Sequence, residues 1–219
     1  MMGLKNYDNL YRLYLRSRKK QRIAFFICLA LFILSAATFI IDGFPFEVSL
    51  IMMAMIFPAI LFGIILLVSR SRTLKSMETF SPSQLTAINR EIPSCPMYEG
   101  LFAASEAVVG TKLGGLQLVP VKNILWVYTN VTVEKLNGII PIYKYTALIL
   151  ADRDHKQYSF RIKNDQKAFF FIQSELLKSR LDLVFGYERG MDDIYKNDIN
   201  RLISFSLECA EKRRREWGI

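Results

Sequence analysis

Two long uncharged apolar runs dominate the hydropathy pattern of the first third of the chain. They cover residues 23–41 and 48–68, and only six residues separate them. At a rise of about 1.5 Å per residue, helices of these lengths match the roughly 30 Å hydrocarbon core of a bilayer. Because six residues allow only a tight turn, the two runs predict an antiparallel transmembrane hairpin whose two ends lie on the same side of the membrane.

Two other interpretations of these runs are less consistent with the pattern. A cleaved secretory signal has an apolar region of about 7 to 15 residues, shorter than residues 23–41, and no second apolar run follows it directly. A helical hairpin buried in a soluble protein normally keeps a polar face on each helix. Pro58 and Gly63 interrupt the second run, but both residues are tolerated in membrane helices. We therefore expect an integral membrane protein.

The pattern changes to short elements after the hairpin. Ser81-Pro82-Ser83-Gln84 is a capping box with proline at the first helical position, and it predicts a helix that ends near Glu91. From about residue 100 the apolar period becomes two, which is typical of strands. The strand candidates are residues 101–105, 107–110, 116–119, 124–133, 139–151 and 156–162. The turn signals between them, which include Gly114-Gly115, Asn137-Gly138 and residues 152–155, predict an antiparallel meander.

Two helices follow the predicted sheet. Asp165 is a candidate N-cap for a helix with a wide apolar stripe, and Arg180 comes near its end. Burying this stripe against the open side of a curved sheet would cover both elements. Helical spacing of apolar residues returns between residues 198 and 216, where we expect a second helix.

The charge of the chain is concentrated beside the apolar runs. The net charge is +9, and residues 1–22 hold seven Lys and Arg against the single Asp8. Arg70, Arg72 and Lys75 follow the second run, whereas residues 76–219 hold 19 Lys and Arg against 17 Asp and Glu. Lys and Arg that flank a span stay in the cytoplasm, so we expect both termini there. The near balance after residue 75 argues against a nucleic-acid-binding domain.

The basic residues beside the hairpin also suit an anionic lipid surface. Each Lys or Arg beside an anionic leaflet contributes about 1 kcal/mol of attraction, but the same residues could serve only to set topology. The candidate lipid contacts are Arg16, Arg18, Lys19, Lys20, Arg22, Arg70, Arg72 and Lys75. Residues 212–215 with Trp217 form a second basic and aromatic cluster, which suits either a membrane surface or a solvated helix end.

The order of elements from about Gly100 to Leu181 resembles a known family. The step Val119-Pro120-Val121 into a long strand containing Trp126 and Tyr128, the Asn137-Gly138 hairpin and the closing helix are similar to bacterial pleckstrin-homology-like (PH-like or GRAM-like) domains attached to membrane hairpins. This resemblance implies a strongly bent, seven-stranded, partly open barrel capped by a helix, serving for binding or assembly. The lipid-binding members of this family carry a basic loop between their first two strands. The chain departs from them, because Lys112 is the only basic residue at that place.

Catalytic patterns are weak in this sequence. His155 is the only histidine, and it lies in a predicted turn. Residues 110–115 are rich in glycine but lack the order of a phosphate-binding loop. Asp192, Asp193 and Asp198 match a helix start better than a metal site, and Cys28, Cys95 and Cys209 have no paired spacing. We expect no enzymatic activity, no cofactor and no metal.

These observations predict an α+β protein of the inner membrane, with four segments. Residues 1–22 are a basic cytoplasmic segment, residues 23–75 the transmembrane hairpin, residues 76–185 the PH-like domain and residues 186–219 a helical extension. The expected function is non-catalytic binding of another protein or of a second copy of the chain. An anionic-lipid-sensing module and an accessory subunit of a membrane transport complex are the alternatives. Neither span carries an ionisable residue that would line a pathway, which counts against the transport alternative.

Overall fold

The computed structural model describes residues 4–42, 46–112, 114–136, 140–163 and 165–218. Within these ranges, the side chains of residues 35–42, 46–56, 132–136, 140–144 and 165 lie outside the description. The chain divides into two compact units. The first comprises residues 1–78 and 111–117, and the second comprises residues 79–110 and 118–219.

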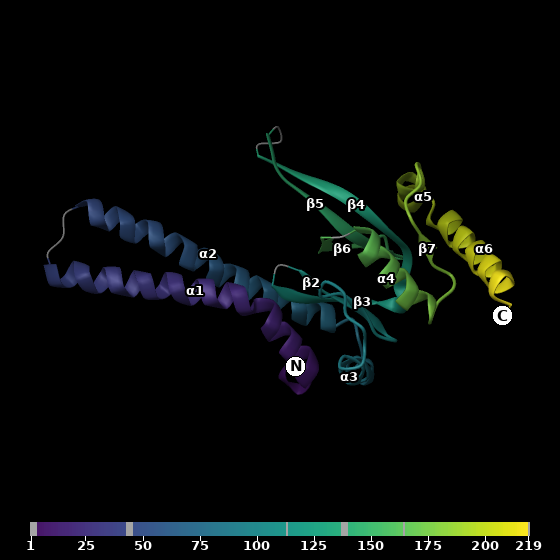
Figure 1. The fold of residues 1–219 in the computed structure, drawn as a ribbon, viewed down its shortest axis with the longest axis horizontal. Coiled ribbons are helices and arrows are strands. Elements are labelled where there is room, and N and C mark those ends of the chain that lie inside the picture. Colours follow the sequence, from purple (N-terminus) through teal and green to yellow (C-terminus); the bar gives the residue numbers. More distant parts are fainter. Residues whose placement is uncertain (1–3, 43–45, 113, 137–139, 164, 219) are drawn as a thin grey trace. The chain divides into compact units, whose positions relative to one another are not determined.

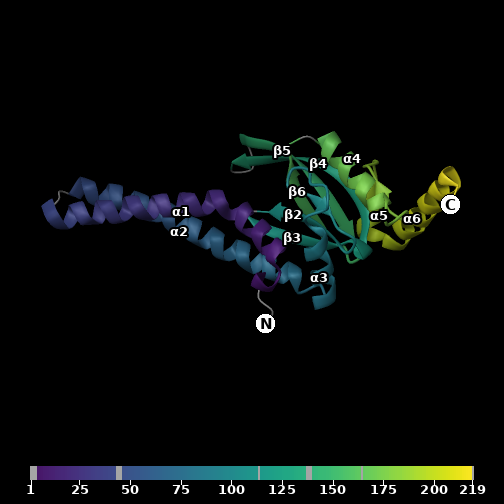
Figure 2. The same cartoon turned by 60° about the horizontal axis from the view of Figure 1, so that its bottom comes forward.

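The first unit is built on two long antiparallel helices. After a 3₁₀ turn at Leu4–Asn6, α1 covers Asp8–Asp42 and α2 covers Phe46–Met77. The two helices run side by side (Figures 1 and 2). Helix α1 begins well before the first apolar run, so the basic segment before residue 23 is helical. Residues 43–45 of the predicted turn lie outside the described residues.

One helical segment of the described chain, Phe57–Met77, is long and apolar enough to cross a membrane. The sequence predicts two spans, and this segment overlaps only the second of them, over residues 57–68. Both predicted spans, residues 23–41 and 48–68, include residues whose side chains are outside the description, so the span in α1 and the membrane topology stay predictions.

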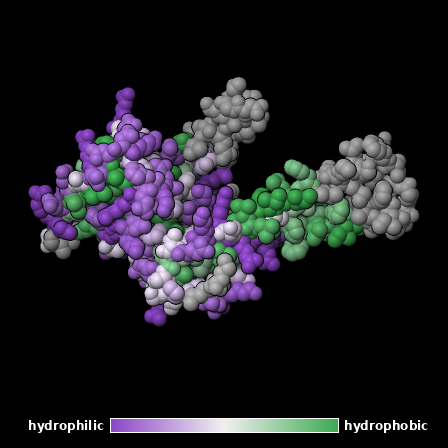
Figure 3. All heavy atoms as spheres, turned by 180° about the vertical axis from the view of Figure 1, so that it is seen from behind, coloured by the Kyte–Doolittle hydropathy of each residue, from purple (hydrophilic) through white to green (hydrophobic). Residues whose placement is uncertain are grey.

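Both helices nevertheless expose large apolar side chains over the described parts of these runs. The exposed fractions lie between 40% and 70%. Figure 3 shows hydrophobic residues, in green, gathered over the described part of the two long helices. They are Ile23, Phe26, Ile27, Leu31, Ile33 and Leu34 on α1, and Phe57, Ile60, Leu61, Ile64, Leu67 and Val68 on α2. We call these twelve residues the apolar belt.

The strands form two small sheets. One has the order β1-β2-β3 and the other has the order β6-β5-β4-β7. The strands are β1 Phe102–Ala103, β2 Ala107–Lys112, β3 Gly115–Pro120, β4 Ile124–Leu136, β5 Ile140–Asp152, β6 Gln157–Ile162 and β7 Val184–Phe185. The tip that joins β2 to β3, residues 111–117, belongs to the first unit, and the remaining strand residues belong to the second.

The expected mixed α+β class is confirmed, but the strands described here do not close into a barrel. A 3₁₀ turn at Val121–Asn123 lies between β3 and β4, and the chain passes there from one sheet to the other. Strand β7 pairs in parallel with β4 through Trp126 and Val127. The sequence did not predict β7, because a two-residue strand is too short to show a period.

The predicted turns have mixed outcomes. The turn after β5 is confirmed, with His155 at a positive φ of 60°. There the Asp152 carboxylate accepts hydrogen bonds from the backbone N–H groups of Asp154 at 2.9 Å and Lys156 at 2.8 Å. The Asn137-Gly138 turn lies outside the described residues, as does the side chain of the predicted cap Asp165.

Four helices accompany the sheets in the second unit. They are α3 Pro82–Glu91, α4 Asp165–Leu177, α5 Met191–Asn197 and α6 Ile199–Trp217. The predicted capping box of α3 is confirmed, since the Ser81 hydroxyl accepts from Gln84 N–H and the Gln84 side chain accepts from Ser81 N–H. Helix α6 confirms the predicted final helix, and Asp192 and Asp193 lie in the first turn of α5.

The second unit has two apolar clusters, one on each face of the sheet that contains β4 and β5. One cluster joins both sheets to α4, through residues such as Val108, Leu148 and Ile172. The other joins the opposite face to α5 and α6, through Trp126, Tyr195 and Leu202. The uninterrupted apolar start of β4, residues 124–128, fits this burial on both faces.

Candidate functional site

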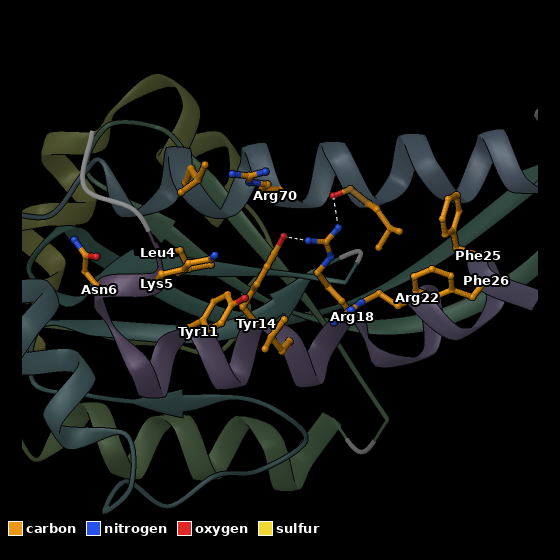
Figure 4. Close-up of a pocket in the computed structure, with 13 residues that line it drawn as sticks. Leu4, Lys5, Asn6, Tyr11, Tyr14, Arg18, Arg22, Phe25, Phe26 and Arg70 are labelled. Atoms are coloured by element: carbon orange, nitrogen blue, oxygen red, sulfur yellow. Dashed lines mark hydrogen bonds between the residues drawn. The ribbon is translucent and has the colours of Figure 1, made fainter. Parts of the chain in front are cut away.

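A basic groove lies along the helices of the first unit. Tyr11, Tyr14, Arg18, Arg22 and Phe25 follow one another at spacings of three or four residues, so they share one face of α1. They line a groove of about 760 Å³ together with Arg70 of α2. Figure 4 shows Tyr14 and Arg18 reaching from α1 toward α2. We call this space the α1–α2 groove.

Arg18 is held in place within the α1–α2 groove. Its guanidinium donates hydrogen bonds to the Tyr14 hydroxyl and, at 2.7 Å, to the Leu66 carbonyl oxygen (Figure 4). The buried Arg18 Nε has no acceptor among the described residues. Burial lowers the pKa of Arg18, and the nearby charges of Arg22 and Arg70 lower it further. A negative charge placed here would relieve that repulsion and supply the missing acceptor.

Cationic side chains line one part of the groove, and apolar side chains line another part. Lys5, Arg18, Arg22 and Arg70 contribute four cations, and none of the described residues that line it is acidic. The apolar lining includes Phe25, Phe26 and Leu66. These three residues lie just inside the ends of the two predicted spans, whereas the cations lie outside the spans. The groove is therefore amphipathic, with its polarity changing at the predicted membrane boundary.

The structure separates the eight predicted lipid contacts into three groups. Arg18, Arg22 and Arg70 line the α1–α2 groove. Arg16 and Lys19 instead line a shallower depression of about 440 Å³ with Arg22. The remaining three predicted contacts line neither space and are exposed; they are Lys20, Arg72 and Lys75. Helical geometry explains the division, because neighbouring residues in a helix point about 100° apart.

The uncharged residues of this groove are not among those predicted from the sequence. Tyr11 and Tyr14 were not identified, although they precede Arg18 by seven and four residues. The signal was available as a helical periodicity of aromatic and basic residues that continues upstream of the apolar run. The dense positive charge of residues 1–22 obscures this periodicity in the sequence.

The tip of the β2–β3 hairpin docks on the same helices. The Leu116 N–H donates to the Thr73 hydroxyl at 2.9 Å, and the Ser17 hydroxyl donates to the Gly114 carbonyl oxygen at 3.0 Å. A Cβ atom at Gly115 would lie 2.6 Å from the Ser69 carbonyl oxygen. Gly114-Gly115 was predicted only as a turn, but the close approach to α2 also requires glycine at position 115.

The C-terminal basic cluster does not act as one surface. Arg213 turns inward and donates to the carbonyl oxygens of Leu181 and, at 2.6 Å, Leu183. Its guanidinium also lies 5.4 Å from the centre of the Phe185 ring. The neighbouring residues 212, 214 and 215 are exposed, as is Trp217. Arg213 therefore fastens α6 to the segment around β7.

The other residues singled out from the sequence occupy structural positions. The exposed His155 ring lies 5.4 Å from that of Tyr195. The Asp192 carboxylate accepts from the Tyr187 hydroxyl at 2.8 Å, and Asp198 caps α6. Over the described chain no group of three or more His, Cys, Asp or Glu side chains could hold a metal ion, and the three cysteines are free.

Comparison with known proteins adds no assignment, because no family model, curated protein or solved structure matches the chain. The resemblance to bacterial PH-like domains therefore depends on the order of elements and on the residues that carry it.

Proposed function

We propose that the chain is an integral inner-membrane protein of two spans that presents its second unit in the cytoplasm as a non-catalytic protein-binding module. The observation that carries the binding role is a two-stranded arm formed by the far ends of β4 and β5. The membrane anchor is supported separately, by the apolar belt and by the charges that flank it.

The apolar belt supports an anchor made of both helices. Monomeric soluble proteins rarely expose an apolar patch larger than a few hundred Å². Here six large apolar side chains on each helix are 40% to 70% exposed. Lipid would cover these side chains, and the flanking Lys and Arg would keep both ends of the hairpin in the cytoplasm.

The arm extends beyond the four-stranded sheet. β4 and β5 pair with each other up to Leu136 and Ile140. β7 pairs with β4 only at Trp126 and Val127, and β6 pairs with β5 only from Thr146 onward. Residues 130–136 and 140–144 thus have no second neighbouring strand among those described. Such edges bind an added strand through main-chain hydrogen bonds.

The packing of the second unit supports a PH-like arrangement. The larger of its two clusters places α4 against residues from both sheets, as expected for a helix that caps a split barrel. Helices α5 and α6 cover the opposite face of the sheet and leave the arm as its extension. In this proposal the domain is a rigid support, and the arm is the contact element.

Site-specific photo-crosslinking in native membranes tests the binding role. A photoreactive residue replaces Asn130 or Val131, which are exposed at the start of the arm, and Ser204 on the exposed side of α6 serves as the control position. We expect both arm positions to give an adduct of one discrete added mass and the Ser204 position to give none. Coexpressing two differently tagged copies distinguishes a second copy of this chain from another protein.

The proposal fails if the arm positions yield only lipid adducts, or if Ser204 gives the same products as the arm. Alkaline carbonate washing tests the anchor independently. Release of the full chain from vesicles would refute membrane integration whatever the crosslinking result.

A further inference from the structure

We propose that the α1–α2 groove is a binding site for one phospholipid with a net negatively charged headgroup, taken from the inner leaflet. The headgroup phosphate would lie among Arg18, Arg22 and Arg70, and the start of an acyl chain would follow Phe25, Phe26 and Leu66. This inference goes beyond the protein-binding role and does not depend on the β4–β5 arm.

Charge complementarity identifies the occupant. Four cations line the groove, and none of its described lining residues is an acid that would neutralise them. Bringing the cations together costs electrostatic energy that an anion would recover. The buried Arg18 Nε, which has no acceptor in the described part of the chain, is a donor already oriented by the bond from Arg18 to the Leu66 carbonyl oxygen. Arginine forms strong charge-assisted bonds with phosphate oxygens.

The apolar lining selects a lipid over a free anion. Phe25, Phe26 and Leu66 line the same space as the cations, and Phe26 is also part of the exposed apolar belt. A soluble phosphate would leave these side chains against water, whereas an acyl chain would cover them. The volume of about 760 Å³ is sufficient for a headgroup with the first part of its chains.

The experiment uses the full chain reconstituted in vesicles of phosphatidylcholine with one fifth phosphatidylglycerol. A trace of photoactivatable phosphatidylglycerol labels the protein, and the labelled peptides are mapped by mass spectrometry. We expect labels within residues 11–26 and 66–74. Excess unlabelled phosphatidylglycerol should displace the label, whereas added phosphatidylcholine or millimolar inorganic phosphate should not.

Two double variants distinguish a specific lipid-binding site from general electrostatic attraction to the membrane surface. Arg22→Gln with Arg70→Gln removes two groove cations and keeps Arg18 and its bond to Leu66. Lys20→Gln with Arg72→Gln removes the same charge from exposed positions outside the groove. We expect the groove variant to lower labelling about tenfold or more and the control to lower it less than about threefold.

Three results would overturn the inference. Equal losses in the two double variants would show only diffuse attraction, equal labelling by phosphatidylcholine probes would show only apolar contact, and displacement by inorganic phosphate would indicate a free-anion site. Because the variants leave the second unit unchanged, the outcome is independent of crosslinking at Asn130 and Val131.

Discussion

The Arg180 side chain links the turn between β3 and β4 to the segment that follows α4. Its guanidinium donates to the carbonyl oxygens of Val121 at 2.6 Å and Ile124 at 2.8 Å, next to the turn that leads from β3 to β4. It also forms two bonds to the Asp182 carboxylate, at 2.9 and 2.5 Å. In the sequence, Arg180 is only a residue near the end of a predicted helix. Its partners come from segments about sixty residues apart, and only folding brings them together.

Removing Arg180 should destabilise the second unit. Arg180→Ala leaves two carbonyl oxygens without their donor and removes the two shorter bonds to the Asp182 carboxylate, which should cost about 2–4 kcal/mol. Thermal melting of the full chain in detergent, followed by circular dichroism, measures the loss. Arg153→Ala is the matched control, because Arg153 contacts the same carboxylate at 3.2 Å but is 43% exposed. Its effect should stay below about 1 kcal/mol, and equal effects would contradict the assigned role.

The Asp182 carboxyl makes the same interaction pH-dependent. Burial opposes its ionisation, but the hydrogen bonds and charge of Arg180, with Arg153, outweigh burial and lower its pKa below the ordinary 3.8. A lowered pKa of an acid stabilises the folded state above the ordinary value, and the contribution is lost as pH falls below it. Below pH 4, the melting temperature of Arg180→Ala should therefore fall less with decreasing pH than that of the natural chain.

Tyr128 carries a second pH dependence, of opposite sign. Burial raises its pKa to about 12, with the charge of Asp192 and then Tyr187 adding to the effect. The neutral form is the one that the fold favours, so its contribution is complete below about pH 10 and is lost as pH rises toward 12. Tyr128→Phe should lose less stability over that interval and show one fewer late-titrating phenol by absorbance. An unchanged alkaline transition would refute this.

At the scale of elements, short segments are held by contacts that are distant in sequence. β7 has two residues and pairs with β4 at only two positions. Arg213 reinforces it from α6 through the carbonyl oxygens on either side of Asp182 and through the ring of Phe185. The aromatic group around Trp126 adds to this, with Tyr128 stacked at 4.0 Å and the indole N–H donating to the Gly186 carbonyl oxygen at 2.6 Å.

Arg213→Ala should loosen this end of the second unit. Two carbonyl oxygens and one aromatic face lose their cation, so local stability should fall by about 1–2 kcal/mol. Hydrogen exchange of the full chain in detergent should show faster exchange at residues 181–186 and at the end of α6. Arg214→Ala removes the same charge from an exposed neighbour and should leave exchange unchanged. Similar profiles for the two variants would show that position 213 has no special role.

At the scale of the whole molecule, the proposed two-span anchor would determine on which side of the membrane every other surface lies. Ile60 lies near the middle of the predicted second span and is 56% exposed. Ile60→Lys should raise the apparent free energy of membrane insertion by about 3 kcal/mol. Resistance to carbonate extraction should fall accordingly.

Leu67→Lys is the control for this change. Leu67 is 69% exposed but lies at the end of the span, where a lysine can reach the interface. The Leu67→Lys variant should therefore resist carbonate extraction as well as the natural chain does. In intact cells, external protease should leave the residues beyond Lys75 undigested, and their digestion would reverse the proposed orientation.

Local sequence patterns alone determined the fold class and several secondary-structure elements of this protein. The mixed α+β class, the capping box at Ser81, the helix to Trp217 and the turn at His155 follow from periodicities and caps that each involve only a few neighbouring residues. Such features are set by backbone geometry and by local hydrogen bonds, so the sequence contains them directly.

Only the tertiary structure decided which residues meet. It divided the strands into two sheets, added β7 to β4, directed Arg213 inward and brought Arg70 beside Arg18 and Arg22. It also excluded Lys20, Arg72 and Lys75 from the α1–α2 groove, although they carry the same charge. These outcomes depend on side chains from distant segments competing for the same space and the same hydrogen bonds, and no local period records that competition.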